Sequence, residues 1–341
     1  MISNAVPPHT HRTHRPKRVS HRAAATSDYL ARLAPRLTSR DRWLIRMLYE
    51  HRVFTSGQIT DLAWPSVRAA NHRLHQLYVW RVIDRFKPFV SYGSAPMHYV
   101  LDVAGATVLA HEECLEVRSL GYRHERAMGI AYSLMLAHAV GANGFFTDLV
   151  ALSRQADTHG HLAAWWSEAR CRRHFGDVVC PDGYGRWQAP DGEFEWFLEY
   201  DRGTERPAKR VGDKLPRYAK LAENTGIITP VLVWTPTLRR ETAVRHALDQ
   251  ALAALPDPAA VPVAVTNGEL IADGDALSAR WLPLTACSAN RLRLSDLSSA
   301  WPQLPPLPAT PDEPAGRSGT ASLLPPPIPQ CPKAGSDRGW W

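Results

Sequence analysis

The chain has 341 residues, of which 45% are hydrophobic and 9% aromatic, and its formal net charge is +7. This apolar content is enough for real cores and excludes a wholly disordered protein. No apolar run approaches the roughly 18 residues that span a bilayer, and the start lacks the apolar stretch of a secretion signal. The five cysteines are scattered without a CxxC pair, which argues against a zinc ribbon or a disulfide framework. We therefore expect a cytoplasmic protein without a membrane segment.

The positive charge is concentrated at the start of the chain. Residues 1–36 carry seven basic side chains and one acid, and so account for all but one of the net charges. The basic residues are Arg12, Arg15, Lys17, Arg18, Arg22, Arg32 and Arg36. This composition predicts a disordered basic arm that seeks phosphates, and it says little about the folded part.

Composition and pattern divide the chain into four stretches and predict an α+β protein. Residues 1–36 are the basic arm, residues 37–115 a first folded domain, and residues 120–295 a second, α/β domain. Residues 300–341 hold eleven of the 28 prolines and are predicted to be a disordered tail. The tail either recruits a partner as polyproline II or is inert.

The first domain shows helix start signals at three places. Thr38 and Thr55 stand where N-caps are expected, and Pro65-Ser66 starts a third helix with apolar residues at helical spacing. Two β-prone runs, 81–86 and 97–101, and a closing helix follow. Three helices, a hairpin and a helix is the order of a winged helix-turn-helix.

In that fold the third helix enters the major groove and the wing contacts the backbone. The predicted base-reading residue is Arg68, and the wing residues are predicted to hold phosphates. The full set of predicted DNA contacts is Arg68, His72, Arg73, His75, Arg85 and Lys87. Two alternatives remain, since basic residues on a helix are commonly a solvated face, and winged helices also serve as protein–protein modules.

The second domain alternates helical and β patterns. Its predicted helices are 124–139, 206–224 and 241–255, and its predicted strands lie near 165–172, 177–181, 194–200, 227–234 and 261–265. Continuous apolar runs such as 227–234 are typical of strands buried on both faces.

Two acidic motifs lie on this frame. Asp182 stands in Pro-Asp-Gly at a predicted strand end, and Glu199 lies at the end of the next strand. This is the order of the PD-(D/E)xK, restriction-endonuclease-like core, in which carboxylates hold Mg²⁺ at the scissile phosphate. Asp182 and Glu199 are the predicted metal ligands, and Glu125 on the preceding helix is a third.

The third motif position departs from that pattern, because Asp201 stands where a lysine is expected. A carboxylate does not stabilise transition-state charge as an ammonium does. Either Lys209 or Lys214 from the following helix reaches in, or the site is a metal-binding remnant. The predicted catalytic set is Asp182, Glu199, Asp201 and Lys214, and whether the protein is a nicking endonuclease stays open.

Two sequence blocks resemble the replication-relaxation family of plasmid- and mobile-element-associated proteins. The first is LTSRDRWLIRMLYEHRVFTSGQI with HRLHQL and VWRVIDRF, and the second is EWFLEYDRGTERPAKRVGDKLPRYAKL. The resemblance spans roughly residues 37–240. It implies a part in plasmid replication or relaxation and direct DNA contact. The acidic block it carries over is Asp182, Glu199, Asp201 and Glu205.

These observations predict a DNA-binding factor for replication or mobilisation of a mobile element, with a nuclease-like second domain. The expected partners are double-stranded DNA and a relaxase or replication initiator, and the protein is a candidate homodimer. One alternative is a non-catalytic transcriptional regulator whose second domain dimerises or binds a partner. Another is a scaffold that recruits a separate relaxase through the proline-rich tail.

Overall fold

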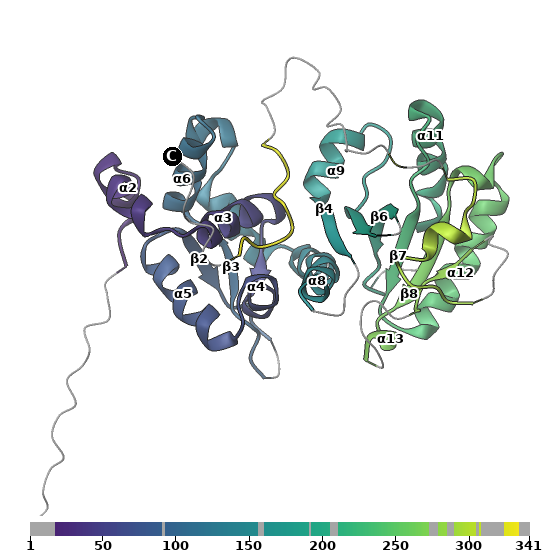
Figure 1. Ribbon diagram of the computed structural model, residues 1–341, viewed down its shortest axis with the longest axis horizontal. Coiled ribbons are helices and arrows are strands. Elements are labelled where there is room, and N and C mark those ends of the chain that lie inside the picture. Colours follow the sequence, from purple (N-terminus) through teal and green to yellow (C-terminus); the bar gives the residue numbers. More distant parts are fainter. Residues whose placement is uncertain are drawn as a thin grey trace, which may run out of the picture.

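The structure is a computed structural model that describes residues 18–90, 93–155, 160–190, 192–204, 211–272, 279–284, 290–304, 307 and 324–333. Its helices and strands form two lobes, with the long helix α8 (Leu136–Ser153) lying between their sheets (Figure 1). The predicted α+β class is confirmed. Within the described residues, no single helix is long and apolar enough to cross a membrane, although one bent pair, 117–132 with 136–153, reaches that length and composition together.

The first lobe contains a three-stranded antiparallel sheet in the order β1-β3-β2. Its elements are α1 (His21–Ala24), α2 (Ser27–Leu33), α3 (Ser39–His51), β1 (Phe54–Thr55), α4 (Ser56–Ala63), α5 (Val67–Val79), β2 (Ile83–Phe86), β3 (His98–Leu101) and α6 (Val103–Glu112). Short 3₁₀ turns lie at Ala34–Arg36, Val117–Leu120, Ile130–Tyr132, Pro258–Ala260 and Leu297–Ala300.

Local hydrogen bonds explain where the three central helices begin. The Thr38 hydroxyl accepts from the Asp41 backbone N–H, and the Asp41 carboxylate accepts from the Thr38 N–H in return. Thr55 and Gln58 form the same reciprocal capping box at α4, and Ser66 caps α5. The predicted caps of all three helices are therefore confirmed.

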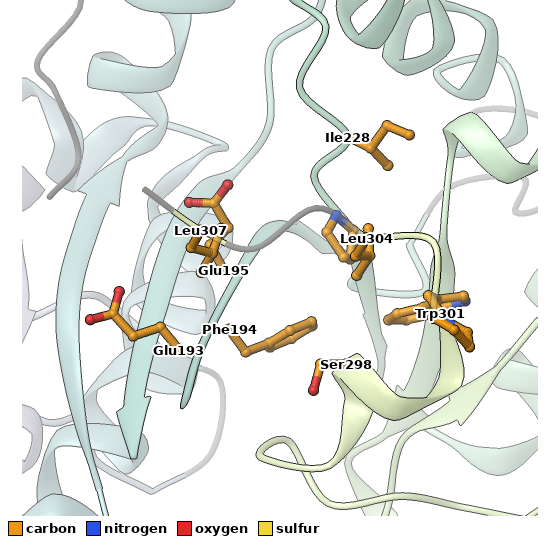
Figure 2. A pocket seen from close by; sticks show the side chains of 10 residues that line it. Glu193, Phe194, Glu195, Ile228, Ser298, Trp301, Leu304 and Leu307 are labelled. Carbon is orange, nitrogen blue, oxygen red and sulfur yellow. The ribbon is translucent and has the colours of Figure 1, made fainter. Parts of the chain in front are cut away.

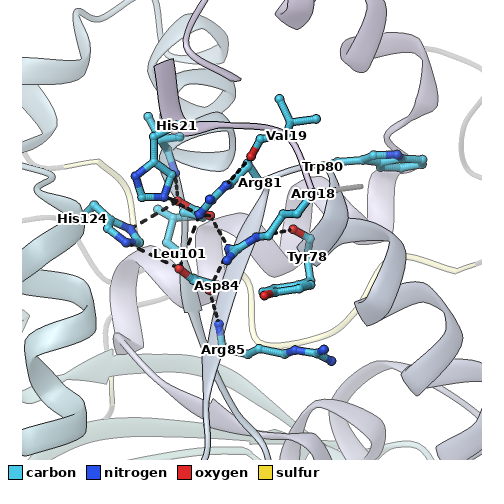
Figure 3. A network of polar contacts seen from close by, with 12 residues as sticks. Arg18, Val19, His21, Tyr78, Trp80, Arg81, Asp84, Arg85, Leu101 and His124 are labelled. Atoms are coloured by element: carbon cyan, nitrogen blue, oxygen red, sulfur yellow. Dashed lines mark hydrogen bonds and ion pairs between the residues drawn. The ribbon is translucent and has the colours of Figure 1, made fainter. Parts of the chain in front are cut away.

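Residues 18–36 are not the disordered arm that composition predicts. They form α1 and α2, and Ala24, Leu30 and Leu33 are buried in the core. Arg18 lies between two buried carboxylates, with its Nη2 2.7 Å from Asp84 and 2.8 Å from Asp102 (Figure 3). Composition counts the basic charges of this segment but not the distant acids that pair with them. Residues 1–17 lie outside the described part.

The second lobe is built on a six-stranded sheet in the order β4-β5-β6-β7-β8-β9. Strands β4 to β6 pair antiparallel, β6 to β8 parallel, and β9 antiparallel to β8. The elements besides α8 are β4 (His161–Ser167), α9 (Glu168–Phe175), β5 (Gly183–Ala189), β6 (Gly192–Tyr200), α11 (Leu215–Thr225), β7 (Val231–Thr235), α12 (Leu238–Ala253), β8 (Val263–Asn267), α13 (Glu269–Ala272) and β9 (Leu282–Pro283). The short helix α7 (His124–Gly129) precedes α8 and packs against β3 of the first lobe.

Two hydrophobic cores cover the two faces of this sheet. Helix α8 covers one face, where Phe146 stacks near Trp165 and Trp196. Helices α11 and α12 cover the other, where Tyr218 and Leu248 join the buried valines of β7 and β8. The predictions of β6, β7, β8 and α12 are confirmed within a few residues.

Three elements predicted for the second domain differ from the structure. The continuous helix 124–139 is broken, because α7 ends at Gly129 and α8 starts at Leu136 after a bend of 100°. Glycine is a poor helix former, and the Ser133 hydroxyl accepts from the Met135 N–H at the bend. The predicted strand 177–181 is a turn leading into β5, and the strand near Trp165 ends at Ser167, which caps α9.

The two lobes share buried contacts. His51 at the end of α3 stacks on Trp165 of β4 with ring centroids 3.8 Å apart. Glu50 forms a buried ion pair with Arg170 of α9, 2.9 Å between Oε2 and Nη2. The lobes are therefore joined by a common core and a charged pair as well as by the chain.

Part of the proline-rich tail is ordered, against the prediction for 300–341. Trp301 is buried, and residues 324–333 run beside α3 (yellow in Figure 1). Trp43 Nε1 donates to the Ile328 carbonyl at 2.8 Å, and Arg170 Nη2 donates to the Leu324 carbonyl at 2.6 Å. A proline has no backbone N–H but keeps its carbonyl, so a proline-rich segment has more acceptors than donors. Its carbonyls accept the hydrogen bonds of buried donors in both lobes. The rest of the tail lies outside the described residues.

Candidate functional site

A cavity of about 640 Å³ opens at the end of β6 in the second lobe. It brings together most of the acidic and basic residues that the motifs single out. Its lining includes His138, Asp182, Glu199, Asp201, Lys214 and Arg240.

The pairing of β5 with β6 places the two motif carboxylates at one sheet edge. Asp182 precedes β5 and Glu199 lies near the end of β6. Because the two strands are antiparallel, β5 starts at the sheet edge where β6 ends. The Asp182 N–H donates to the Leu198 carbonyl at 3.0 Å, and the Tyr200 N–H donates to Asp182 Oδ2 at 2.8 Å. The backbone thus holds Asp182 beside the residues that flank Glu199.

Glu199 is buried, and both of its oxygens have a donor. Lys214 Nζ lies 2.5 Å from Oε2, and the Tyr218 hydroxyl donates to Oε1 at 2.5 Å. Burial raises the pKa of Glu199 to about 7, with the charge of Asp182 adding to the rise and Lys214 opposing it. The structure therefore sets a carboxyl that titrates near neutrality beside an ammonium.

Asp182 has a histidine partner that the sequence did not indicate. His138 Nε2 of α8 lies 3.2 Å from Asp182 Oδ1. Burial alone would raise the pKa of Asp182, but the hydrogen bond from His138 and the charge of Lys214 hold that pKa below its ordinary value. In the same way, burial would lower the pKa of His138, and Asp182 raises it overall. The two side chains favour each other's charged forms.

The structure places the side chains of Lys214 and Asp201 differently from the motif pattern. Lys214, just before α11, reaches the Glu199 carboxylate, so the basic residue comes from the following helix, as one of the two readings predicts. Asp201 instead binds Arg240 of α12 through both oxygens, at 2.5 and 2.9 Å. Its charge is therefore neutralised within the cavity wall. Lys209 and Glu205 lie outside the described residues.

Glu125 does not join the cavity, and this prediction is wrong. It is exposed on α7, on the far side of the bend that separates α7 from α8. The break in the predicted helix 124–139 is the reason, because it detaches Glu125 from the helix that carries His138. Tyr218 had a readable signal, since Lys214 and Tyr218 are four residues apart and share a helix face. His138 and Arg240 had none that local pattern supplies.

The predicted DNA contacts of α5 separate into two groups. Arg68, His72 and His75 are exposed. Arg73 is turned inward, where its Nε donates to Asp41 Oδ1 at 3.0 Å and its Nη2 to the Arg36 carbonyl at 2.8 Å. Its prediction as a DNA contact is corrected, because the buried Asp41 carboxylate depends on this guanidinium.

Of the predicted wing residues, Arg85 lies in β2 and Lys87 directly follows it. Arg85 is partly exposed and stacks over the Tyr78 ring, 4.2 Å from its centroid. Lys87 is exposed, and Phe89 beyond it is 95% exposed. Residues 91 and 92 lie outside the described part. The hairpin therefore presents a cation and an aromatic ring to solvent.

A second polar cluster lies in the first lobe (Figure 3). His21, Asp84, Asp102 and His124 offer ligand atoms within 4.8 Å of one another, the one such group of three or more in the described part of the chain. Arg18 and Arg81 already pair with its two carboxylates. We interpret it as an ion-pair cluster that fastens the N-terminal segment and α7 to the strands.

A smaller cavity of about 200 Å³ lies near the opposite end of β6 from Glu199 (Figure 2). The Phe194 side chain points across it toward Trp301. Its carboxylates are engaged, Glu195 by the Tyr184 hydroxyl at 2.5 Å and Glu193 by Arg186 at 3.2 Å. Its lining holds no histidine or lysine, so it offers fewer chemical groups than the cavity of Asp182 and Glu199.

Comparison with known families matches residues 45–236 to the model described as replication-relaxation. The match covers more than half of the chain and includes α5, Asp182, Glu199 and Lys214. No curated protein and no solved structure matches the chain. The chain therefore belongs to the replication-relaxation family, which suggests a role in plasmid or mobile-element replication or relaxation.

Proposed function

We propose that this protein binds duplex DNA through its first lobe and acts on a phosphodiester of that DNA in the cavity of its second lobe. The setting is replication or relaxation of a plasmid or other mobile element. The proposed activity is nicking with the aid of a divalent cation such as Mg²⁺. A relaxase or replication initiator as partner, and a homodimer, stay predictions.

The topology of the first lobe supports a winged helix. Helices α3, α4 and α5 are followed by the β2-β3 hairpin, and β1 completes a small antiparallel sheet. In this fold the start of the third helix meets base edges. Arg68, near the start of α5, is exposed and makes no ion pair with another described residue. Arg85 and Lys87 are placed to contact phosphates, which orient the protein without reading sequence.

One observation carries the proposal for the second lobe: Asp182, Glu199 and Lys214 line the same cavity. Two carboxylates from adjacent strands and a nearby ammonium are the groups that a PD-(D/E)xK nuclease uses. The third motif position holds Asp201 where a lysine is expected, and Lys214 supplies the positive charge instead. The restriction-endonuclease-like fold is proposed on this arrangement and on the order of strands and helices.

The donor set offers a divalent cation two carboxylates, and Mg²⁺ is commonly held by one or two carboxylates while keeping several of its waters. Lys214 and Tyr218 already donate to the two oxygens of Glu199, so the cation would use the remaining lone pairs of these oxygens. Asp182 and Glu199 would hold the cation. When bound, it polarises the phosphate and lowers the pKa of an attacking water.

The remaining residues position these two carboxylates and supply charge. Tyr218 fixes Glu199 Oε1, and His138 fixes Asp182 Oδ1. The Lys214 ammonium at Glu199 Oε2 is the group that can stabilise negative charge developing on a phosphate in the cavity. Arg240 keeps Asp201 neutralised, which removes one carboxylate's repulsion of the phosphate.

A nicking assay on supercoiled plasmid with Mg²⁺ or Mn²⁺ tests the proposal. We expect the wild-type protein to convert supercoiled plasmid to open circles, and Asp182→Asn to abolish this conversion. Glu125→Gln is the matched control, because Glu125 is an exposed acid outside the cavity, and it should nick as the wild type does. A wild-type protein that never nicks, and whose melting temperature the metal raises no more than that of Asp182→Asn, would refute the proposed cavity function.

A further inference from the structure

An apolar tip projects from the bend between α7 and α8. Tyr132, Leu134 and Met135 form it, with exposed fractions of 92%, 93% and 48%. Large apolar side chains exposed side by side are uncommon away from binding surfaces. The tip is therefore a candidate binding surface.

The backbone of the tip is held from both sides. Ile130 on one side is buried against Val53 and Val100, and Leu136 on the other packs on the same cluster. The Ser133 N–H donates to the Ile130 carbonyl, and the Leu136 N–H to the Ser133 carbonyl, both at 3.1 Å. The apolar side chains are thus presented by a fixed turn, which lowers the entropic cost of binding a ligand.

The tip is continuous with the proposed phosphodiester site. Leu134 and Met135 line the cavity that holds Asp182 and Glu199. His138, which contacts Asp182, follows Met135 by three residues, or about 4.5 Å along a helix. Stacked nucleotides are about 3.4 Å apart along a strand. A nucleotide next to the one in the cavity would therefore lie at the tip.

The charges around the tip favour a polyanion over an apolar protein surface. Arg126 is exposed on α7 and Arg123 is exposed just before it, and Arg202 lines the same cavity as Leu134 and Met135. Within the described part of the chain, none of the three forms an ion pair. Apolar groups flanked by unpaired cations match a strand of nucleic acid, which offers flat base faces between phosphates. Base faces are free only where the duplex is open, since stacking covers them elsewhere.

We propose that Tyr132, Leu134 and Met135 stack on unpaired nucleotides beside the cavity, so that the preferred substrate is DNA with a single-stranded or unstacked segment at the target phosphodiester. This inference rests on the proposed DNA function. It adds a substrate class and assigns the tip its role. Tyr132 supplies an aromatic platform, and the two aliphatic side chains act as a wedge.

Binding of the full chain to three DNAs of one sequence tests the inference: an uninterrupted duplex, the same duplex with a short single-stranded gap, and the single strand. A 2-aminopurine in the gap reports base stacking by fluorescence. The test variant is Tyr132→Ala/Leu134→Ala. The control is Ile227→Ala, which removes an exposed apolar side chain, 57% exposed, from a turn outside the cavity lining. All of these side chains are exposed, so equal melting temperatures should verify the folds.

We expect the wild type and Ile227→Ala to prefer gapped DNA to intact duplex and to change the 2-aminopurine signal. The double variant should bind the gapped DNA about tenfold more weakly, as expected for a lost base stack, and bind intact duplex as before. Unchanged gap preference in the double variant would overturn the inference while leaving duplex binding intact. So would a change of oligomeric state in that variant, which would show that a second protein copy covers the tip. Failure of the wild type to bind any of the three DNAs would instead refute the proposed function itself.

Discussion

Lys214 Nζ lies 2.5 Å from Glu199 Oε2, joining the start of α11 to the end of β6 across fifteen positions of sequence. The contact puts an ammonium at the carboxylate that Asp182 also approaches. Motif spacing places an acid, Asp201, where a lysine is expected. The ammonium group comes instead from Lys214, and Arg240 neutralises the Asp201 carboxylate.

The first prediction concerns this lysine. Lys214→Met should lower nicking by at least about 100-fold, because loss of one group that stabilises transition-state charge costs about 3 kcal/mol. Lys220→Met is the matched control, since Lys220 is exposed on the same helix and does not line the cavity. Plasmid nicking rates at saturating Mn²⁺ measure both. Equal rates for the two variants would exclude Lys214 from the chemistry.

The second prediction is a pH dependence of stability. Glu199 has a pKa of about 7 in the folded protein and about 4.5 when unfolded. Between these values the folded state binds the extra proton, so this group's stabilisation is full below about pH 4.5 and is lost as the pH rises toward 7. Glu199→Gln does not titrate. Its free energy of unfolding, relative to wild type, should therefore rise by up to about 3 kcal/mol between pH 4.5 and 7.5. Urea unfolding at both pH values measures this, and a constant difference would contradict the raised pKa.

The third prediction separates two arginines of α5. Arg68→Ala should weaken binding to a specific duplex by about 1–3 kcal/mol without changing the melting temperature, because its side chain is exposed. Arg73→Ala should destabilise the fold by about 2–4 kcal/mol, because it leaves the buried Asp41 carboxylate without its guanidinium. Fluorescence anisotropy and thermal unfolding distinguish the two effects. If Arg68→Ala leaves affinity and site preference intact, α5 is not the reading helix.

The fourth prediction concerns the N-terminal segment. Arg18→Ala should lower stability on the order of 2 kcal/mol, because Asp84 and Asp102 then rely on Arg81 alone for a guanidinium. Arg22→Ala, an exposed arginine in α1, should leave stability within about 0.5 kcal/mol. Denaturant unfolding of the two variants gives the comparison. Equal stabilities would mean that the segment is not anchored by Arg18.

The fifth prediction concerns the junction of the lobes. Arg170→Met should cost about 3–5 kcal/mol, since it leaves Glu50 buried and unpaired and frees the Leu324 carbonyl. Glu50→Gln in the same chain should recover part of that loss, because the unpaired charge is then gone. A double-mutant cycle by urea unfolding measures the coupling. Additive effects would show that the pair does not join the lobes energetically.

Local pattern was enough for the elements whose stabilising contacts are close in sequence. The capping boxes at Thr38 and Thr55 bond within three residues, and β7 is an apolar run buried on both faces. The two motif carboxylates were identified from sequence, but their common edge depends on β5, which starts directly after Asp182. The start of β5 lies beside the end of β6 because the two strands are antiparallel.

The tertiary structure decided what depends on distant partners. Residues 18–36 and 324–333 look unable to fold by composition, yet Arg18 reaches Asp102 over 84 positions and Ile328 accepts from Trp43 over 285. Lys214, His138 and the exclusion of Glu125 likewise depend on where helices break and dock. Burying a charge is costly unless a partner is present. That partner is chosen by packing of whole elements, so sequence alone determined the helices and strands, and only their assembly determined which charges meet.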